Sequence, residues 1–261
     1  MTGDELSADI IGNGLGTRLV GKKIIYHPRV TSTMDIARQE AQQGAAEGTV
    51  IIADEQVTGK GRLKRIWLSP GGNVAMSIIL YPSISSVSYL IMLASLAVAR
   101  SIEAVTGLRP QIKWPNDVLI NDKKVCGILS ESDVRGKRVV YAIIGIGLNV
   151  TLELADIPEL LATASSLTGE LGRGVSRVDV TRQILIEIDR LYSTLPSGEE
   201  TVYKEWRDRL VTLGRRVQVK SGTSILEGIA ESVVGDGSLL LRLSDGSVTK
   251  IIAGDVTLRD K

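Results

Sequence analysis

The chain has 261 residues, of which 43% are hydrophobic and 23% are charged, so it can form one or two globular domains with a sizeable core. Lysine plus arginine number 31 and aspartate plus glutamate number 30, a net charge of +1. This balance excludes a protein-wide field that would attract DNA or an anionic membrane, so any cationic site must be local. The single cysteine, Cys126, excludes an internal disulfide and fits a reducing compartment.

Neither end of the chain nor its apolar stretches predict export or membrane insertion. The N-terminal stretch MTGDELSADI carries early acids and lacks the apolar segment of a signal peptide. The longest apolar stretch, residues 89–99, is too short to span a bilayer and is followed by Arg100. We therefore expect a cytoplasmic protein with no membrane partner.

The first half of the chain alternates predicted helices and strands. Residues 1–20, with GNGLG at 12–16, predict a flexible tail. Residues 31–44 predict a helix, with Ser32 as N-cap, Asp35 in the capping-box position and Gly44 as a stop. Residues 49–54 and 73–80 predict strands, separated by a loop at 59–65, and residues 86–105 predict a buried helix.

The second half changes character near Gly214. DVLI and KVCGILSES flank Asn121-Asp122 and predict a hairpin, and residues 138–150 predict a long strand broken by glycines. Residues 179–195 and 199–213 predict two amphipathic helices. Short β-branched runs then alternate with turns, which predicts a barrel of about five strands after a mixed α+β domain. Because this barrel has its own turn pattern, we expect the preceding domain to fold without it.

The stretch GKGRLKR, residues 59–65, is a candidate phosphate-binding loop. Gly59 and Gly61 let the backbone approach a ligand, and arginine offers a planar fork to two oxygens. The stretch contains no acid, and its cations are Lys60, Arg62, Lys64 and Arg65. A solvated basic loop is the commoner meaning of such a run, and the spacing does not match a P-loop.

The stretch KWPNDVLINDKKVCGI places charges beside a strand that is predicted to be buried. Lys113, Asp117 and Lys124 would be costly there unless they are paired or used. Taken alone, the stretch is better interpreted as a stabilising hairpin with surface lysines. GIGLN, residues 145–149, lies on a predicted strand, where glycines mark the close approach of a ligand or of another backbone.

Two kinds of chemistry are excluded by composition. His27 is the only histidine, which rules out a multi-histidine zinc site, and we predict a structural role for it. Cys126 lies in an apolar run and is better interpreted as a small buried hydrophobe than as a nucleophile.

In combination, these motifs resemble the biotin protein ligases from about residue 21 to the C-terminus. The chain carries TSTM where the family has Ser-Thr-Asn, and DEQVTGKGRLKRIW in place of a Gln, a Gly-Arg-Gly-Arg loop and a Trp. KWPND, KVCGI and GIGLN follow in the family's order. The related lipoate ligases share the fold but lack KWPND.

The resemblance implies an architecture and a reaction. After a tail at 1–20, it implies a catalytic domain over 21–212, similar to class II aminoacyl-tRNA synthetases, and an SH3-like barrel over 213–261. About 20 leading residues are too few for the helix-turn-helix domain of some members, so it implies a single-function ligase. It also implies ATP-dependent formation of biotinyl-5′-AMP with Mg²⁺, and transfer of biotin to a lysine of a biotin carboxyl carrier protein.

Other functions remain open at this stage. The alternatives are a lipoate/octanoate-protein ligase and a non-catalytic biotin-adenylate sensor that binds nucleic acid through its barrel. We expect no DNA partner, because the net charge is near zero. Family members often pair, so a homodimer is a candidate assembly.

The resemblance also implies roles for individual residues. Biotin contacts are implied for Ser32, Thr33, Met34, Gln56, Gly59, Lys60, Gly61, Arg62, Lys124 and Gly127. Contacts to ATP or the adenylate are implied for Arg62, Arg65, Trp67, Lys113, Asn116 and Asn149. Catalytic roles are implied for Lys124, Arg62, Lys113 and Asp117, with Mg²⁺ near Asp117 and no metal ligand assigned. Met34 and Lys60 depart from the family's Asn and Arg.

Overall fold

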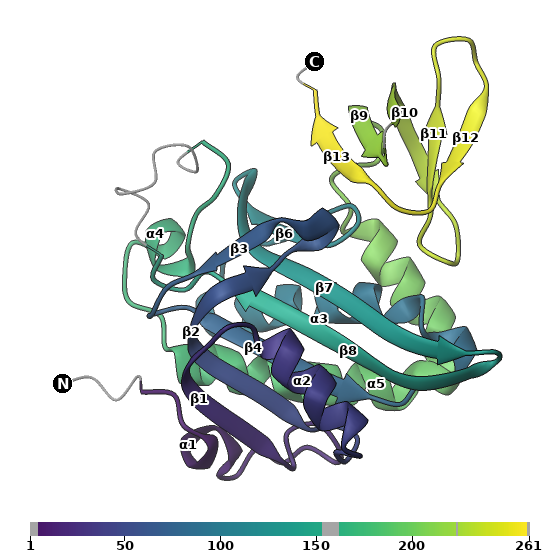
Figure 1. Cartoon of the computed structure of the whole chain (residues 1–261). Helices are drawn as coiled ribbons and strands as arrows, with labels where there is room; N and C mark the ends of the chain where they lie inside the picture. The colour runs from purple at the N-terminus through teal and green to yellow at the C-terminus, as the bar shows by residue number, and fades with distance from the viewer. Residues whose placement is uncertain (1–4, 153–161, 223, 260–261) are drawn as a thin grey trace.

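The structure is a computed structural model of the whole chain, and it describes residues 5–152, 162–222 and 224–259 (Figure 1). Its larger sheet has the strand order β1-β2-β4-β8-β7-β6-β5, with β3 paired to β2. The pair β1–β2 is parallel and the other pairs are antiparallel. The strands are β1 (Ile24–Val30), β2 (Val50–Lys60), β3 (Ile66–Ser69), β4 (Val74–Leu80), β5 (Gln111–Lys113), β6 (Asp117–Ile120), β7 (Lys123–Arg135) and β8 (Arg138–Leu148).

Helices cover both faces of this sheet. The short α2 (Thr33–Gln42) packs on one face, where its buried side chains join Ile51 and Ile143 (Figure 1). The long helices α3 (Tyr89–Thr106) and α5 (Arg177–Asp208) pack together on the other face, against alternate residues of the same strands. Because both faces are covered, every residue of β4 is buried.

Helix α3 is the buried helix predicted for residues 86–105. It is long and apolar enough to cross a membrane, but 67% of it is buried inside the protein. Its apolar positions run all round its circumference, which is the pattern of a core helix as well as of a membrane span. The remaining helices are α1 (Ala8–Gly12), α4 (Leu167–Leu171) and the 3₁₀ turns η1 (Arg62–Lys64) and η2 (Ile84–Ser86).

The predicted helix boundaries agree best with the structure where a glycine ends the helix. Helix α2 begins after Ser32, as predicted, although the Ser32 side chain makes no capping hydrogen bond. Gly44, at φ +82°, follows its end. The two helices predicted after residue 179 are a single helix, α5, with a break at Gly198, and it ends at Asp208 rather than at residue 213.

The hairpin predicted around Asn121-Asp122 is confirmed. Both residues have positive φ, 50° and 62°, as a type I′ turn requires, and β6 and β7 flank them. Two other predictions need correction. Strand β8 runs through Gly145 and Gly147 without a break, and β2 continues to Lys60, so the predicted loop at 59–65 begins as strand.

The N-terminal segment is not the flexible tail expected over the part that the structure describes. Four of its side chains are buried in the main core: Leu6, Ile11, Leu15 and Val20. Two side chains of α5 hold its backbone. The Asp189 carboxylate accepts N–H bonds from Arg18, Leu19 and Val20, and Arg182 donates to carbonyls near the end of α1.

A small antiparallel sheet follows α5 and confirms the prediction of about five strands. Its order is β12-β11-β10-β9-β13, and all of its pairs are antiparallel. The strands are β9 (Arg216–Ser221), β10 (Ser224–Val233), β11 (Leu239–Arg242), β12 (Val248–Ile251) and β13 (Asp255–Leu258). The Trp114 indole donates to the Gly237 carbonyl at 2.8 Å and the Tyr203 hydroxyl to the Val233 carbonyl at 2.6 Å, which joins the barrel to the larger domain.

Candidate active site

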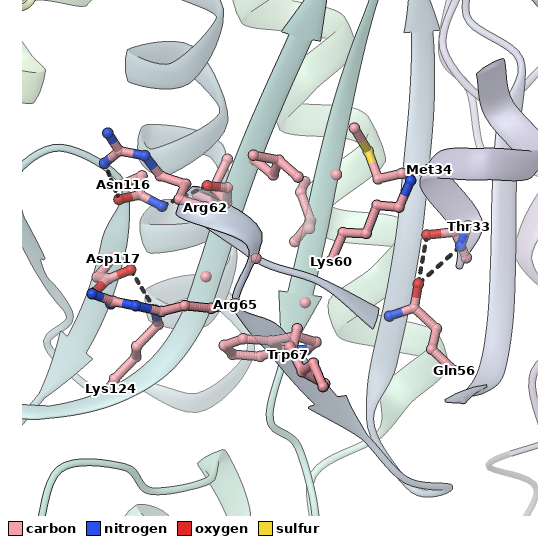
Figure 2. Close-up of a pocket in the computed structure, with 18 of the residues that line it drawn as sticks. Thr33, Met34, Gln56, Lys60, Arg62, Arg65, Trp67, Asn116, Asp117 and Lys124 are labelled. Atoms are coloured by element: carbon pink, nitrogen blue, oxygen red, sulfur yellow. Dashed lines mark hydrogen bonds and ion pairs between the residues drawn. The ribbon is translucent and has the colours of Figure 1, made fainter. Parts of the chain in front are cut away.

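Glycines form the floor of a cavity over β7 and β8, roofed by the β2–β3 connection (Figure 2). Gly127 and Gly147 are paired across the two strands, and Gly145 lies two residues earlier on β8. A Cβ at Gly127 would lie 2.9 Å from the Trp67 ring, and one at Gly147 would overlap the indole. These glycines are therefore required for the close approach of side chains that cover the floor.

Hydroxyl and amide groups line one end of the cavity, beside α2. Gln56 Oε1 accepts from the Thr33 backbone N–H at 2.9 Å and from Thr33 Oγ1 at 3.1 Å (Figure 2). Thr33 Oγ1 in turn accepts from Ser77 Oγ on β4 at 2.8 Å. Directly before Thr33, the Ser32 hydroxyl is buried and has no partner among the described residues. A buried hydroxyl without a partner is unusual, and a polar ligand group here would satisfy it.

Cationic side chains line the opposite end of the cavity, and the side chains of Asn116 and Asp117 hold two of them in place. Arg62 Nη1 donates to Asn116 Oδ1 at 3.0 Å, and Asn116 is itself held by the Ile128 carbonyl at 2.7 Å. The Lys124 ammonium lies 2.6 Å from Asp117 Oδ1 and 5.3 Å from the Trp67 ring centroid, within the range of a cation–π contact. Figure 2 shows this ion pair on the side of the cavity opposite Thr33 and Gln56.

Burial leaves this cationic end short of counter-charge. It lowers the pKa of Lys113 below its usual range, an effect that the nearby Lys124 reinforces and Asp117 opposes. Burial also lowers the pKa of Arg62, against the pull of Asp255 and Asp117. A depressed pKa in a cation means that its charged form is poorly solvated, so an anion placed here would be stabilised.

A second cavity adjoins the first at its cationic end. The two share five residues: Arg65, Ile66, Trp67, Asp117 and Lys124. The second cavity adds Lys113 and Asn149, and barrel residues form part of its wall: Arg215, Thr257 and Leu258. Lys124 and Asp117 thus lie at the boundary between the two cavities.

The barrel contributes directly to these cavities, which the sequence motifs did not predict. Asp255, at the start of β13, lines the first cavity and forms an ion pair with Arg65. The Arg215 guanidinium lines the second cavity and lies 3.8 Å from Asp122 in the β6–β7 turn. No sequence pattern marks these positions, because they come from a segment that meets the site only in the folded chain.

The residues implied by the resemblance gather at these cavities. The first is lined by Thr33, Met34, Gln56, Lys60, Gly61, Arg62, Arg65, Trp67, Asn116, Asp117, Lys124 and Gly127. Lys113 and Asn149 line the second. Gly59 pairs with Trp67 across β2 and β3, where an added Cβ would be 2.5 Å from the Trp67 carbonyl oxygen, and neither Gly59 nor Ser32 lines either cavity. Met76 also lines the first cavity and was predicted only as part of a strand, whereas Gly145 and Gly147 belong to GIGLN, which was predicted to mark the close approach of a ligand or of another backbone but was given no site role at these two positions.

Lys60 lines the first cavity and also joins a chain of charged side chains on α2 and β7. Its ammonium forms an ion pair with Asp35 of α2, and Arg38 bridges Asp35 at 2.8 Å to Glu131 of β7. Of these four side chains, only Lys60 lines the first cavity. Lys60 therefore holds the β2–β3 connection against α2 as well as lining the cavity.

Cys126, which the sequence predicted to be a small buried hydrophobe, directly precedes Gly127 of the cavity floor but does not line the cavity. Cys126 is fully buried, and burial raises the pKa of its thiol, so it is a poor nucleophile. Among the described residues no group of three or more His, Cys, Asp or Glu side chains could hold a metal ion. The Asp117 carboxylate is engaged by Lys124 rather than free.

A mixed sheet with this cavity, followed by a small barrel, is the arrangement of a cofactor–protein ligase, and sequence profiles agree. The Biotin/lipoate A/B protein ligase family matches residues 26–149, and the Biotin protein ligase C terminal domain matches residues 212–259. The chain belongs to the biotin protein ligase family, and it is 37% identical to the Bifunctional ligase/repressor BirA of Bacillus subtilis over 97% of this chain and 79% of that protein.

Other similar proteins support this assignment. The biotin–[acetyl-CoA-carboxylase] ligase of Paracoccus denitrificans is 32% identical over 76% of this chain and 86% of its own length. The solved structure of the biotin protein ligase from Aquifex aeolicus in complex with biotin and ATP has a TM-score of 0.77 and 28% identity, and covers 92% of this chain and 100% of that one. The predicted α+β fold with a C-terminal barrel is confirmed.

Proposed function

We propose that this chain forms biotinyl-5′-AMP from biotin and ATP and transfers biotin to a lysine of a biotin carboxyl carrier domain, in the cytoplasm. The observation that carries the proposal is the position of Lys124. It stands where two cavities meet, paired with Asp117 and packed over Trp67. A carboxylic acid in the first cavity and a nucleotide in the second would bring their reacting groups together at this lysine.

Biotin would lie along the first cavity, with its ureido group at one end and its carboxylate at the other. The ureido group of biotin both donates and accepts hydrogen bonds, and the end beside α2 offers Thr33 and Gln56, with the buried, unpartnered Ser32 hydroxyl directly before Thr33. The fused rings and the alkyl chain would lie along the glycine floor under Trp67. The carboxylate would then reach Lys124 and Arg62, which are the partners a carboxylate prefers.

The first step brings two anions together. The biotin carboxylate attacks the α-phosphorus of ATP, the bond to the bridging oxygen breaks, and pyrophosphate leaves. Arg62, Lys113 and Lys124 would screen the repulsion and stabilise the charge that develops on the phosphoryl oxygens. Their fixed positions matter, since Arg62 is held by Asn116 and Lys124 by Asp117.

The second step is attack by the acceptor amine on the mixed anhydride. The carrier lysine nitrogen bonds to the biotinyl carbonyl carbon, the bond to the phosphate oxygen breaks, and AMP leaves with the proton released to solvent. We assign Asp117 to positioning Lys124, because the two are already paired. The β2–β3 connection would cover the adenylate, with Trp67 above it and Arg62 at its phosphate.

Magnesium enters this proposal as MgATP, the nucleotide substrate. The described residues offer no cluster of three acidic, histidine or cysteine ligands, so a protein-only site does not fit. Magnesium usually keeps several waters and binds through phosphates with one or two carboxylates, and Asp117 lies beside the second cavity.

The domain boundaries are part of the same proposal. Residues 21–212 would form the catalytic unit, and residues 213–261 would form the barrel that closes it.

Direct detection of the adenylate tests the proposal. The purified chain is incubated with ATP, Mg²⁺ and biotin, lipoate or octanoate in separate reactions, and the products are identified by mass spectrometry. We expect biotinyl-AMP, and biotinylation of a single lysine when a biotin carboxyl carrier domain is added. An adenylate formed from lipoate or octanoate but not from biotin would refute the proposal. An unmodified carrier with abundant biotinyl-AMP would refute the transfer step alone.

Two points about partners are part of the same proposal. We expect no DNA partner, and a gel shift at low salt, where non-specific binding is strongest, tests this. A homodimer is the candidate assembly, and light scattering with and without biotin and ATP measures it.

A further inference from the structure

Met34 fills a notch in the floor of the first cavity. Met34 is 3% exposed and lines the cavity (Figure 2), and its side chain lies against Gly145 of β8. A Cβ placed at Gly145 would lie 2.6 Å from Met34 Sδ and 3.1 Å from Met34 Cγ. The thioether thus occupies the space that any other residue at position 145 would fill.

This notch lies at the end of the cavity that would hold the rings of biotin. Gly145 pairs with Ser77, whose hydroxyl donates to Thr33, so the Met34–Gly145 contact is next to the hydroxyl and amide groups. Gly147, which lies under Trp67, is two residues further along β8, about 7 Å away. The Met34 wall is therefore separate from the cationic end where the carboxylate would bind.

A methionine makes an adjustable wall. It is unbranched, it has three rotatable bonds and its sulfur is polarizable, so it can fill an irregular gap and move with little strain. A residue with a side chain at position 145 would remove this freedom, because Met34 would be pushed into the cavity. The pair works only as a glycine opposite a long flexible side chain.

We infer that the Met34–Gly145 pair determines which ring systems the cavity accepts, with Met34 as the wall that excludes enlarged rings. This inference rests on the proposed function and adds a specificity residue to it. Met34 touches the rings of the acid and not the reacting carboxylate, so it changes the choice of substrate rather than the chemistry.

The first test compares two altered acids with biotin. Biotin sulfone carries added oxygens on the ring sulfur, and homobiotin carries an added methylene in the chain. In the Met34→Ala variant we expect the ratio of kcat/KM for biotin sulfone over biotin to rise about 10- to 100-fold, the range for a small group in an apolar pocket. The ratio for homobiotin over biotin should stay within about twofold, because the chain end is unchanged.

The second test examines the contact itself. Gly145→Ala should lower kcat/KM for biotin, because its methyl group forces Met34 Sδ into the cavity. The double variant Gly145→Ala with Met34→Ala should recover most of this loss, which a change in general stability would not produce. If Met34→Ala does not fold, Met34→Val removes the atoms beyond Cγ, keeps a buried apolar side chain and should change the sulfone ratio in the same direction.

The outcomes separate this inference from the function on which it rests. A wild-type chain that makes no biotinyl-AMP refutes the proposed function. A wild-type chain that does so, with an unchanged sulfone ratio in the folded Met34 variant, overturns the inference alone. A double variant as impaired as Gly145→Ala also overturns it, and equal changes for sulfone and homobiotin would show a loosened cavity rather than a ring-specific wall.

Discussion

Replacing Lys124 with alanine tests the central assignment, because this side chain lies at the junction of the two cavities. The substitution removes an ammonium that is 2.6 Å from Asp117 and 5.3 Å from the Trp67 ring centroid. It also removes the methylenes that pack near Gly127, where an added Cβ would lie 3.2 Å from Lys124 Cε. Lys123→Ala is the matched control, since Lys123 adjoins Lys124 but lies outside the lining of both cavities.

The loss of Lys124 should lower both the stability of the fold and the rate of adenylation, and the two effects can be estimated separately. The Lys124 side chain is 31% exposed and that of Asp117 20%, so their pair is partly screened, and its loss should cost about 1 kcal/mol of stability. That corresponds to a fall in Tm of roughly 2–4 °C for a chain of this size. In the reaction, loss of a charged contact to the transition state in a desolvated site typically costs about 2–4 kcal/mol. This predicts a fall in adenylation of about 30- to 1000-fold.

The assay measures pyrophosphate release with biotin and MgATP, together with the Tm of each variant. We expect a large loss of rate in Lys124→Ala at a nearly native Tm, and wild-type values for Lys123→Ala. Equal rates in the two variants would refute the role of Lys124. A fall in Tm of more than about 10 °C in Lys124→Ala would show that the pair is mainly structural.

Three further predictions concern the cationic end and the barrel. Arg62→Gly should still consume ATP but release biotinyl-AMP early, so that bystander proteins become labelled in a mass-spectrometric assay; labelling of the carrier alone at the wild-type ATP rate would contradict this. Burial lowers the pKa of Lys113, so its charge destabilises the fold below that pKa and the penalty fades as pH rises toward about 10. Lys113→Met should therefore raise Tm at pH 7, with a gain that shrinks at alkaline pH, while lowering adenylation; a lower Tm at pH 7 would contradict the assignment. A chain ending at residue 212 loses the acceptor of the Trp114 indole N–H and the part of the cavity wall at Arg215. We therefore expect this chain to have a lower Tm, measured by thermal denaturation, and a raised KM for ATP, measured by kinetics. An unchanged KM for ATP would contradict this expectation.

Local rules in the sequence were enough for the elements with strong, short-range signals. The type I′ turn at Asn121-Asp122 follows from residues that tolerate positive φ, and Gly44 ends α2 for the same backbone reason. The alternating β-branched runs after Gly214 predicted the barrel strands. Lys113, Asp117 and Lys124 were expected to be paired or used because they adjoin a buried strand, and all three line the second cavity.

Two predictions from the sequence were wrong because tertiary packing overrides a local signal. Glycine usually weakens a strand, yet β8 passes through Gly145 and Gly147 because neighbouring strands hold its backbone and Met34 and Trp67 cover the gaps. The first 20 residues look like a tail by composition, yet Asp189 and Arg182 of α5 bind their backbone.

Local patterns in the sequence were enough to predict most of the long helices and strands, the two-part architecture and a set of motifs whose combination resembles the family. Each of these depends on residues close together along the chain, where periodicity and backbone preferences act. Which side chains meet follows from the folded chain alone: Lys60 with Asp35, Arg65 with Asp255, and Met34 with Gly145. Such contacts join residues far apart in the chain, and their geometry is set by how strands, α2 and the barrel pack, because no local preference encodes a distance between separate segments.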